Sequence, residues 1–318
     1  MTSFDDQVPD SPDQPEPPKR DDSPEAQPDS LARENTGDPF PYVAAQLLSE
    51  APPESGRQLP EDLRIPWSWS HFVLFLFFGL VSFVVTQLAA AMYLAARVSG
   101  RHLSGPELQE ILTSNPQIAV GANLLLFALI FLFLYVTIAA LHDRPFWRSL
   151  GWRKLGWRSR VSTAPRSPWI FFLGGSALAI GVALVSSTMH TPENLPIEQL
   201  FKNRTGAILL MSMAVLVAPL VEETVFRGYL YPLFAKTFGT LTGILLTGLL
   251  FGLMHGWQLG WTHGLVVMLI VVGIVLTYVR ARTGTVFASF LMHLGYNSMI
   301  AISTVIATHG FTHMPVKP

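Results

Sequence analysis

The chain has 318 residues, of which 50% are hydrophobic and only 14% charged, and its formal net charge is −1. Soluble domains carry about a quarter charged residues, so this deficit and a mean hydropathy of +0.37 predict a membrane protein. Because the chain contains no cysteine, disulfide frameworks, thiol catalysis and thiolate metal sites are excluded.

The first 65 residues differ in composition from the rest of the chain. Residues 1–40 contain eleven Asp or Glu against three Lys or Arg, and residues 1–66 contain thirteen of the 24 prolines. Such a segment cannot bury enough apolar surface to offset the entropy lost on ordering. We therefore expect an acidic, proline-rich, disordered tail over residues 1–65 and a membrane domain over residues 66–318.

Seven apolar segments follow this tail. Each approaches the ~20 residues that an α-helix needs to cross ~30 Å of hydrocarbon. Unpaired backbone groups are too costly in lipid for irregular structure, so the segments should be helical. The expected fold is all-α, a polytopic bundle of about seven or eight transmembrane helices. The segments are 69–96, 118–141, 169–189, 206–234, 240–256, 262–280 and 285–307.

The basic connections predict an orientation in the membrane. The connection 142–168 carries seven Lys or Arg and one Asp, so the positive-inside rule places it in the cytoplasm. Lys236, Arg280 and Arg282 fall on the same side when the connections are counted alternately. We therefore predict an integral protein of the cell (inner) membrane with a cytoplasmic N-terminus. Seven spans place the C-terminus outside, whereas an eighth would reverse it.

Three charged residues stand inside the fourth apolar segment, at Glu222, Glu223 and Arg227. Ionisable groups at membrane depth are costly and usually face a protein interior or an aqueous cavity. Glu223 and Arg227 are four residues apart, so they lie one above the other on a helix and can form a charge-assisted pair. Glu222 is rotated away by about 100° and is free for another role. The alternative is that all three form a structural network only.

Further polar residues occur on the fifth and seventh segments. His255 follows Phe251 by about one helical turn, and His293 and Asn297 share one helix face. Counting along straight helices places Glu222, His255 and His293 within the membrane but at different depths. Helix tilt would have to bring them to one level.

Together these side chains suit hydrolysis of a peptide or an ester. A buried carboxylate beside an imidazole can polarise a water molecule, and a second imidazole with an amide can donate hydrogen bonds to a developing oxyanion. His255, His293 and a glutamate could instead bind Zn²⁺ and leave one position for water. The chain has no HExxH motif of the zincins and no GxSxG motif of serine hydrolases.

Three motifs resemble those of a known family. "EETVFR" matches EExxxR, "FGLMH" matches FxxxH and "HLGYN" matches HxxxN, in this order on successive apolar segments. This pattern is similar to that of the CAAX protease and bacteriocin-processing family (CPBP, Rce1/Abi-type) of intramembrane proteases. The resemblance covers about residues 140–308, and the element "FWRSLGW" after the second segment also fits it. The acidic tail lies outside it.

The resemblance implies an all-α transmembrane protease domain over residues 66–318, with a cavity open toward the cytoplasm. It implies that a glutamate-activated water hydrolyses a peptide bond in a peptide or membrane-associated protein. The catalytic residues it implies are Glu222 as base, His255 beside the water, and His293 with Asn297 at the oxyanion; the supporting residues are Glu223, Arg227 and Phe251.

Three alternatives remain open from the sequence. One is a zinc-dependent version of the same protease, with His255, His293 and Glu222 as ligands, so no cofactor is assigned. The others are a proton-coupled transporter and a non-catalytic membrane scaffold that use the same buried polar residues. The expected partners are the lipid bilayer and a peptide or protein substrate, and nucleic acid is not expected.

Overall fold

The protein is described by a computed structural model over residues 60–97, 104–105, 107, 111, 115–155, 167–189 and 204–312. Every regular element in these ranges is helical, which confirms the predicted all-α fold. Residues 1–59 lie outside the described residues, so the prediction of a disordered tail stays a prediction for them.

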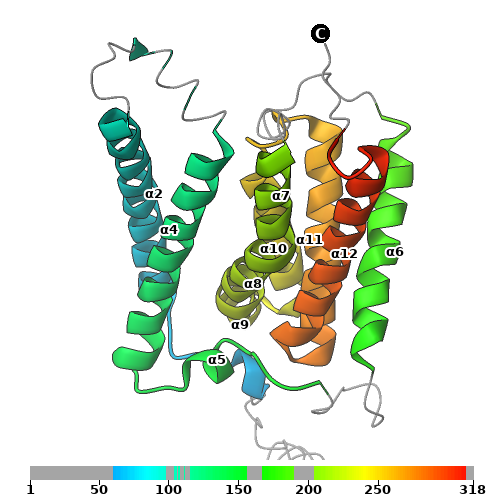
Figure 1. The fold of residues 1–318 in the computed structure, drawn as a ribbon. Helices are drawn as coiled ribbons and strands as arrows, with labels where there is room; N and C mark the ends of the chain where they lie inside the picture. The colour runs from blue at the N-terminus through cyan, green and yellow to red at the C-terminus, as the bar shows by residue number, and fades with distance from the viewer. Residues whose placement is uncertain are drawn as a thin grey trace, which may run out of the picture. The chain divides into compact units, whose positions relative to one another are not determined.

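The helices follow one another along the chain as Figure 1 shows. In chain order they are η1 (Glu61–Leu63), α2 (Trp69–Arg97), α4 (Pro116–Tyr135), η2 (Val136–Ala140), α5 (Phe146–Ser149), α6 (Pro168–Ser186), α7 (Arg204–Ser212), η4 (Met213–Val217), α8 (Ala218–Glu223), η5 (Thr224–Leu230), α9 (Tyr231–Phe238), α10 (Thr240–Met254), α11 (His263–Thr283) and α12 (Val286–Ala307).

Six of the seven predicted segments form helices that are long and apolar enough to cross a membrane. The exception is α10, whose 15 residues extend about 22 Å at 1.5 Å per residue. This helix packs closely against α11, because Gly248 and Gly252 let the two backbones approach: a Cβ at either position would collide with Ile274 or Ile270. The predicted segment 240–256 is thus present as a shorter apolar helix beside six longer ones.

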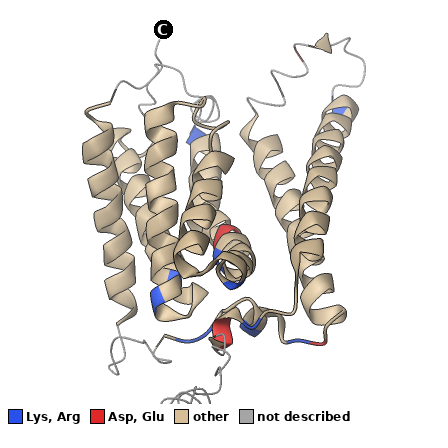
Figure 2. Ribbon diagram, turned by 180° about the vertical axis from the view of Figure 1, so that it is seen from behind, with Lys and Arg blue, Asp and Glu red and all other residues tan. Residues whose placement is uncertain are grey.

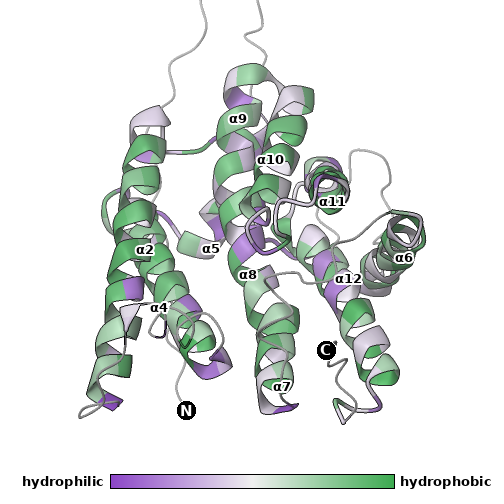
Figure 3. Ribbon diagram, turned by 90° about the horizontal axis from the view of Figure 1, so that it is seen from above, coloured by the Kyte–Doolittle hydropathy of each residue, from purple (hydrophilic) through white to green (hydrophobic). Residues whose placement is uncertain are grey.

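The outer helices expose the side chains expected of a lipid-facing surface. On α2, Phe77 is 64% exposed and Met92 is 72% exposed, whereas the small polar Ser82 and Thr86 are buried. This arrangement reverses that of a soluble helix and suits hydrocarbon as the surrounding solvent. Figure 3 shows hydrophobic residues along most of α2 and α4.

The fourth apolar segment, Arg204–Phe238, is one long helix with two π-helical stretches, η4 and η5. Pro219 and Pro232 lie just after these stretches. Prolines and π-turns are the usual causes of helix bending. In Figure 3, α8 and α9 run across the view while α6 and α11 are seen end-on, so this part of the helix is steeply inclined to its neighbours. The two glutamates lie between the two π-helical stretches.

Two close contacts place the seventh segment, α12, beside α6. A Cβ at Gly175 of α6 would collide with the backbone of Met292, and one at Gly295 of α12 would collide with the backbone of Phe172. Small residues at a helix crossing allow this approach. The contact holds the middle of α12, which carries His293, against α6.

The chain just before α2 is packed rather than extended into solvent. Leu63, Ile65 and Trp67 are buried, although residues up to 65 were predicted to belong to the tail. Asp62 binds the buried Arg280 at 3.0 Å. The predicted boundary at residue 65 therefore differs from the structure, because these apolar side chains pack against helices that lie far away in the sequence. Figure 2 shows charged residues gathered around this end of the helices.

Candidate active site

A cavity of about 310 Å³ opens beside the bend of the long helix, and the predicted catalytic residues all line it. They come from three separate parts of the chain, because Glu222 lies in the last turn of α8, His255 follows α10, and His293 and Asn297 lie on α12. Phe251 of α10 also contributes to the wall. The bend and tilt of the helices thus bring together side chains that counting along straight helices placed at different depths.

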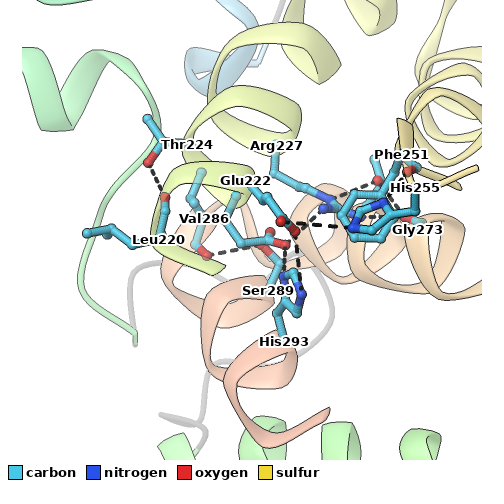
Figure 4. Close-up of polar contacts among 12 residues, drawn as sticks. Leu220, Glu222, Thr224, Arg227, Phe251, His255, Gly273, Val286, Ser289 and His293 are labelled. Carbon is cyan, nitrogen blue, oxygen red and sulfur yellow. Dashed lines mark hydrogen bonds and ion pairs between the residues drawn. The ribbon is translucent and has the colours of Figure 1, made fainter. Parts of the chain in front are cut away.

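Glu222 faces both histidines without a direct hydrogen bond. Its Oε1 lies 3.9 Å from Nε2 of His255, and its Oε2 lies 3.7 Å from Nε2 of His293. Both separations exceed hydrogen-bond length, and polar groups at such distances are commonly bridged by water. The Glu222 side chain is 21% exposed, so it is accessible from the cavity. Figure 4 shows Glu222, His255 and His293 converging from different helices.

His255 is oriented by the backbone of its own helix. Its Nδ1–H donates a hydrogen bond of 2.8 Å to the carbonyl oxygen of Phe251. This bond fixes the tautomer of the neutral imidazole, because the other ring nitrogen then carries the lone pair. Nε2 of His255 is therefore a hydrogen-bond acceptor directed toward Glu222.

His293 is oriented by a carboxylate instead. Its Nδ1–H donates to Oε1 of Glu223 at 3.0 Å, and both side chains are buried. The ring of His293 is thus held by a carboxylate, whereas the ring of His255 is held by a backbone carbonyl. The two histidines thus face Glu222 with different partners behind them.

Glu223 and Arg227 form the predicted ion pair behind the cavity wall. Nη1 of Arg227 lies 2.9 Å from Oε1 of Glu223, and both side chains are completely buried. Arg227 also donates to two groups on α11, from Nη2 to the carbonyl of Gly273 at 2.9 Å and from Nε to Oγ1 of Thr277 at 3.2 Å. Thr277 in turn donates to the carbonyl of Gly273. The sequence analysis missed these two partners, which carry no charge and lie 46 and 50 residues away in sequence.

Phe251 connects this ion pair to the cavity. The guanidinium of Arg227 lies 4.5 Å from the centre of its ring, close enough for a cation–π contact. The same ring lies 4.8 Å from the ring of His255 and 5.7 Å from that of His293. Phe251 is 2% exposed. The phenylalanine of the FxxxH pattern therefore packs against both histidines and the arginine.

Asn297 lines the cavity, and its side chain already makes one hydrogen bond. Its Nδ2 donates a hydrogen bond of 2.7 Å to the carbonyl of Ala214, in the π-helical stretch η4. An amide nitrogen carries two hydrogens, so one remains for a ligand in the cavity. Asn297 thus fastens α12 to the long helix and still presents a donor.

Three further polar residues line the cavity and were not selected from the sequence. They are Asn123 on α4, Gln258 in the turn after α10, and Tyr296 on α12. The remaining lining is largely apolar: Phe127, Leu210, Met211, Met213, Leu269, Val272 and Ile300. Asn123 and Gln258 belong to no recognised motif, although each is a polar residue in or beside an apolar segment, which is the available signal.

The zinc alternative requires donor atoms that converge on one point. Ligands about 2.0–2.1 Å from one tetrahedral zinc ion lie roughly 3.3 Å from each other. The oxygens of Glu222 lie 3.9 and 3.7 Å from the histidine nitrogens. Within the described residues, no group of three His, Cys, Asp or Glu side chains is arranged to hold a metal ion. As they lie, these residues do not fit the ion.

The comparison with protein families bears on this arrangement. Residues 204–299 match the family described as type II CAAX prenyl endopeptidase Rce1-like. This part of the chain is similar to that family. The match includes all three motifs and so confirms the resemblance predicted from them. It supports a membrane-embedded protease of the CAAX type in general terms. No curated protein and no solved structure matches the chain.

Proposed function

We propose that the chain is an intramembrane endopeptidase in which Glu222 activates a water molecule for attack on a peptide bond. The observation that carries this proposal is the placement of Glu222, because it alone of the two adjacent glutamates lines the cavity and faces both histidines at water-bridging distance. The other glutamate is buried in an ion pair.

The two acceptors facing the cavity can orient the nucleophile. A water placed between Glu222 and Nε2 of His255 donates one hydrogen to the carboxylate and the other to the imidazole. Its lone pair then points away from both and toward a carbonyl carbon in the cavity. As the oxygen–carbon bond forms, Glu222 takes the proton from the water. It then delivers that proton to the amine nitrogen when the carbon–nitrogen bond breaks.

His293 and Asn297 suit the opposite task of stabilising the oxyanion. His293 serves this task in the form that carries hydrogens on both ring nitrogens, with Nδ1–H donated to Glu223 and Nε2–H directed toward the cavity. The second amide hydrogen of Asn297 provides another donor. In this assignment His255 assists the base and His293 assists the oxyanion, and the difference follows from their partners.

The apolar lining favours a hydrophobic peptide segment as the substrate class. Methionine and leucine side chains from α7 and η4 make up one wall, and flexible methionines adapt to varied apolar ligands. The polar Asn123 and Gln258 suit the peptide backbone. A membrane-associated protein or peptide meets these requirements.

The test is a comparison of peptides released in cells that express the wild-type chain or Glu222→Gln. A peptide found only with wild type then serves as substrate for the purified protein in detergent. Glu107→Gln is the matched control, because Glu107 is exposed and bonds only to Ser104 in the described contacts. The proposal requires Glu107→Gln to cleave normally and Glu222→Gln to lose nearly all turnover. Equal turnover of both variants contradicts it.

The zinc-dependent version is tested on the same preparation. It requires about one equivalent of zinc in the pure protein, loss of cleavage on chelation and recovery when zinc returns. Glutamate catalysis requires that chelation leave turnover unchanged. Stoichiometric zinc with reversible, chelator-sensitive turnover would replace the glutamate mechanism.

A further inference from the structure

A buried tryptophan contacts the active-site helix from outside the family-matched segment. Trp67 lies just before α2 and is 1% exposed. Its indole Nε1–H donates a hydrogen bond of 3.1 Å to the backbone carbonyl of Tyr229, 162 residues away in sequence. The two rings are also stacked, with centroids 5.2 Å apart and planes at 23°. Both the ring and the N–H of Trp67 are therefore used.

The carbonyl that Trp67 binds belongs to the π-helical stretch η5, Thr224–Leu230. A π-turn is wider than an α-helical turn and is rare, so it needs contacts from outside to persist. Arg227 is two residues before Tyr229 in this stretch and holds Glu223, which in turn holds His293. A shift of η5 would therefore move the groups that orient His293.

A second contact links the same segment to the helix that holds Arg227. Asp62 binds Arg280 of α11 at 3.0 Å, and the Arg280 side chain is 1% exposed. Arg280 lies three residues beyond Thr277 and seven beyond Gly273, so the three share one face of α11. That face also binds Arg227 through Gly273 and Thr277. Residues 60–67 thus contact both η5, which carries Arg227, and α11, which carries Gly273 and Thr277.

We propose that Trp67 is a positioning residue, which holds η5 in the register that keeps Arg227, Glu223 and His293 aligned with the cavity. The claim rests on the proposed function for its kinetic effect, but its structural part does not. Trp67 touches neither the cavity nor the reacting atoms, so it acts through Tyr229 and the backbone of η5.

The chain offers a matched control two residues away. Trp69 also donates from its indole nitrogen to the long helix, at 3.1 Å to Oγ1 of Thr237. That bond reaches α9 close to its end, seven residues beyond η5. Trp67→Phe and Trp69→Phe therefore make the same chemical change against the same helix, one at the π-helical stretch and one away from it.

The experiment measures cleavage, melting temperature and backbone hydrogen exchange for both variants of the full chain. We expect Trp67→Phe to lower kcat roughly threefold to tenfold with KM unchanged, as loss of one buried hydrogen bond that acts on the transition state allows. Exchange should accelerate over residues 224–231 and stay unchanged over residues 286–307. Trp69→Phe should change neither kcat nor exchange over 224–231.

Two outcomes overturn the proposal. One is the same small effect of both variants on exchange over 224–231. The other is a lower melting temperature for Trp67→Phe with kcat per folded molecule unchanged, which marks a purely structural residue. If the wild-type chain cleaves no peptide, the proposed function fails, and the exchange measurement alone decides whether Trp67 holds η5.

Discussion

The two sides of one helix turn carry adjacent glutamates in opposite surroundings. Glu222 is partly exposed in a cavity and has only water-bridging distances to His255 and His293. Glu223 is completely buried and directly bonded to Arg227 and His293. The rotation of about 100° between successive helical residues thus directs two adjacent identical side chains into different surroundings. We assign catalysis to Glu222 and the holding of the surrounding helices to Glu223. Each prediction below breaks one part of this comparison.

Substitutions of the two histidines should affect turnover and melting temperature differently. His255→Gln removes the imidazole beside the water and a hydrogen bond to its own helix only, so it should lower kcat by about 10²–10⁴-fold with little change in melting temperature. His293→Gln should lower both, because it also removes a partner from the buried Glu223. Turnover and melting temperature in detergent check this. Equal melting temperatures for the two variants would contradict the different partners assigned to them.

Loss of the buried Glu223–Arg227 ion pair should mainly lower the free energy of unfolding. Glu223→Gln leaves Arg227 charged and buried without its carboxylate, which costs roughly 3–5 kcal/mol. Adding Arg227→Met to the same chain removes the unpaired charge and should recover part of that loss. Thermal and denaturant unfolding of both single variants and the double variant measure the coupling. A double variant destabilised by the sum of the two single losses would mean that the pair contributes nothing beyond its separate members.

A glycine behind the ion pair should be intolerant of a methyl group. A Cβ at Gly273 would lie 2.8 Å from the carbonyl oxygen of Gly248 and 3.0 Å from Cβ of Phe251. Gly273→Ala should therefore destabilise the protein by about 1–3 kcal/mol, as overpacking does. Gly181→Ala is the control, because nothing lies within 4 Å of its Cβ position. Similar melting temperatures for the two variants would show that α11 can move away without loss.

The contacts of Glu223 and Arg227 show which features of the site could be predicted from the sequence and which could not. The Glu223–Arg227 pair was predictable because helical spacing fixes it, and the motif residues were predictable because charged and polar groups are rare inside apolar segments. The binding of Arg227 to Gly273 and Thr277 was not, since a backbone carbonyl and a hydroxyl leave no pattern in the sequence. Hydropathy likewise cannot distinguish π-helical from α-helical turns, or show that α10 has only 15 residues.

Trp67 illustrates the same limit at the tail boundary. A tryptophan beside a membrane span is typical of the interface, and only the tertiary contact with Tyr229 places it inside. The tail composition pointed to residue 65 as the boundary, yet Leu63 and Ile65 are buried because distant helices provide a site for them.

The smallest effect is expected from the tail. Deleting residues 2–57 removes no motif residue and leaves Asp62 and Trp67 in place, so turnover on a detergent-solubilised peptide should be unchanged. Extending the deletion through residue 67 should lower the melting temperature and turnover together, because it removes the contacts to Arg280 and Tyr229. A large loss of turnover with the shorter deletion, at equal expression, would mean that the tail contributes to the site or to substrate capture.

The central claim is the division of roles between the two glutamates, and paired measurement of turnover and melting temperature for Glu222→Gln and Glu223→Gln tests it most directly. Glu222→Gln keeps the shape of the side chain but removes the base, so it should melt like the wild type and lose nearly all turnover. Glu223→Gln should melt at a clearly lower temperature, with turnover falling as the site loses its support. The reverse result, an unstable Glu222→Gln and a stable but inactive Glu223→Gln, would show that Glu223 is the base and Glu222 the structural residue.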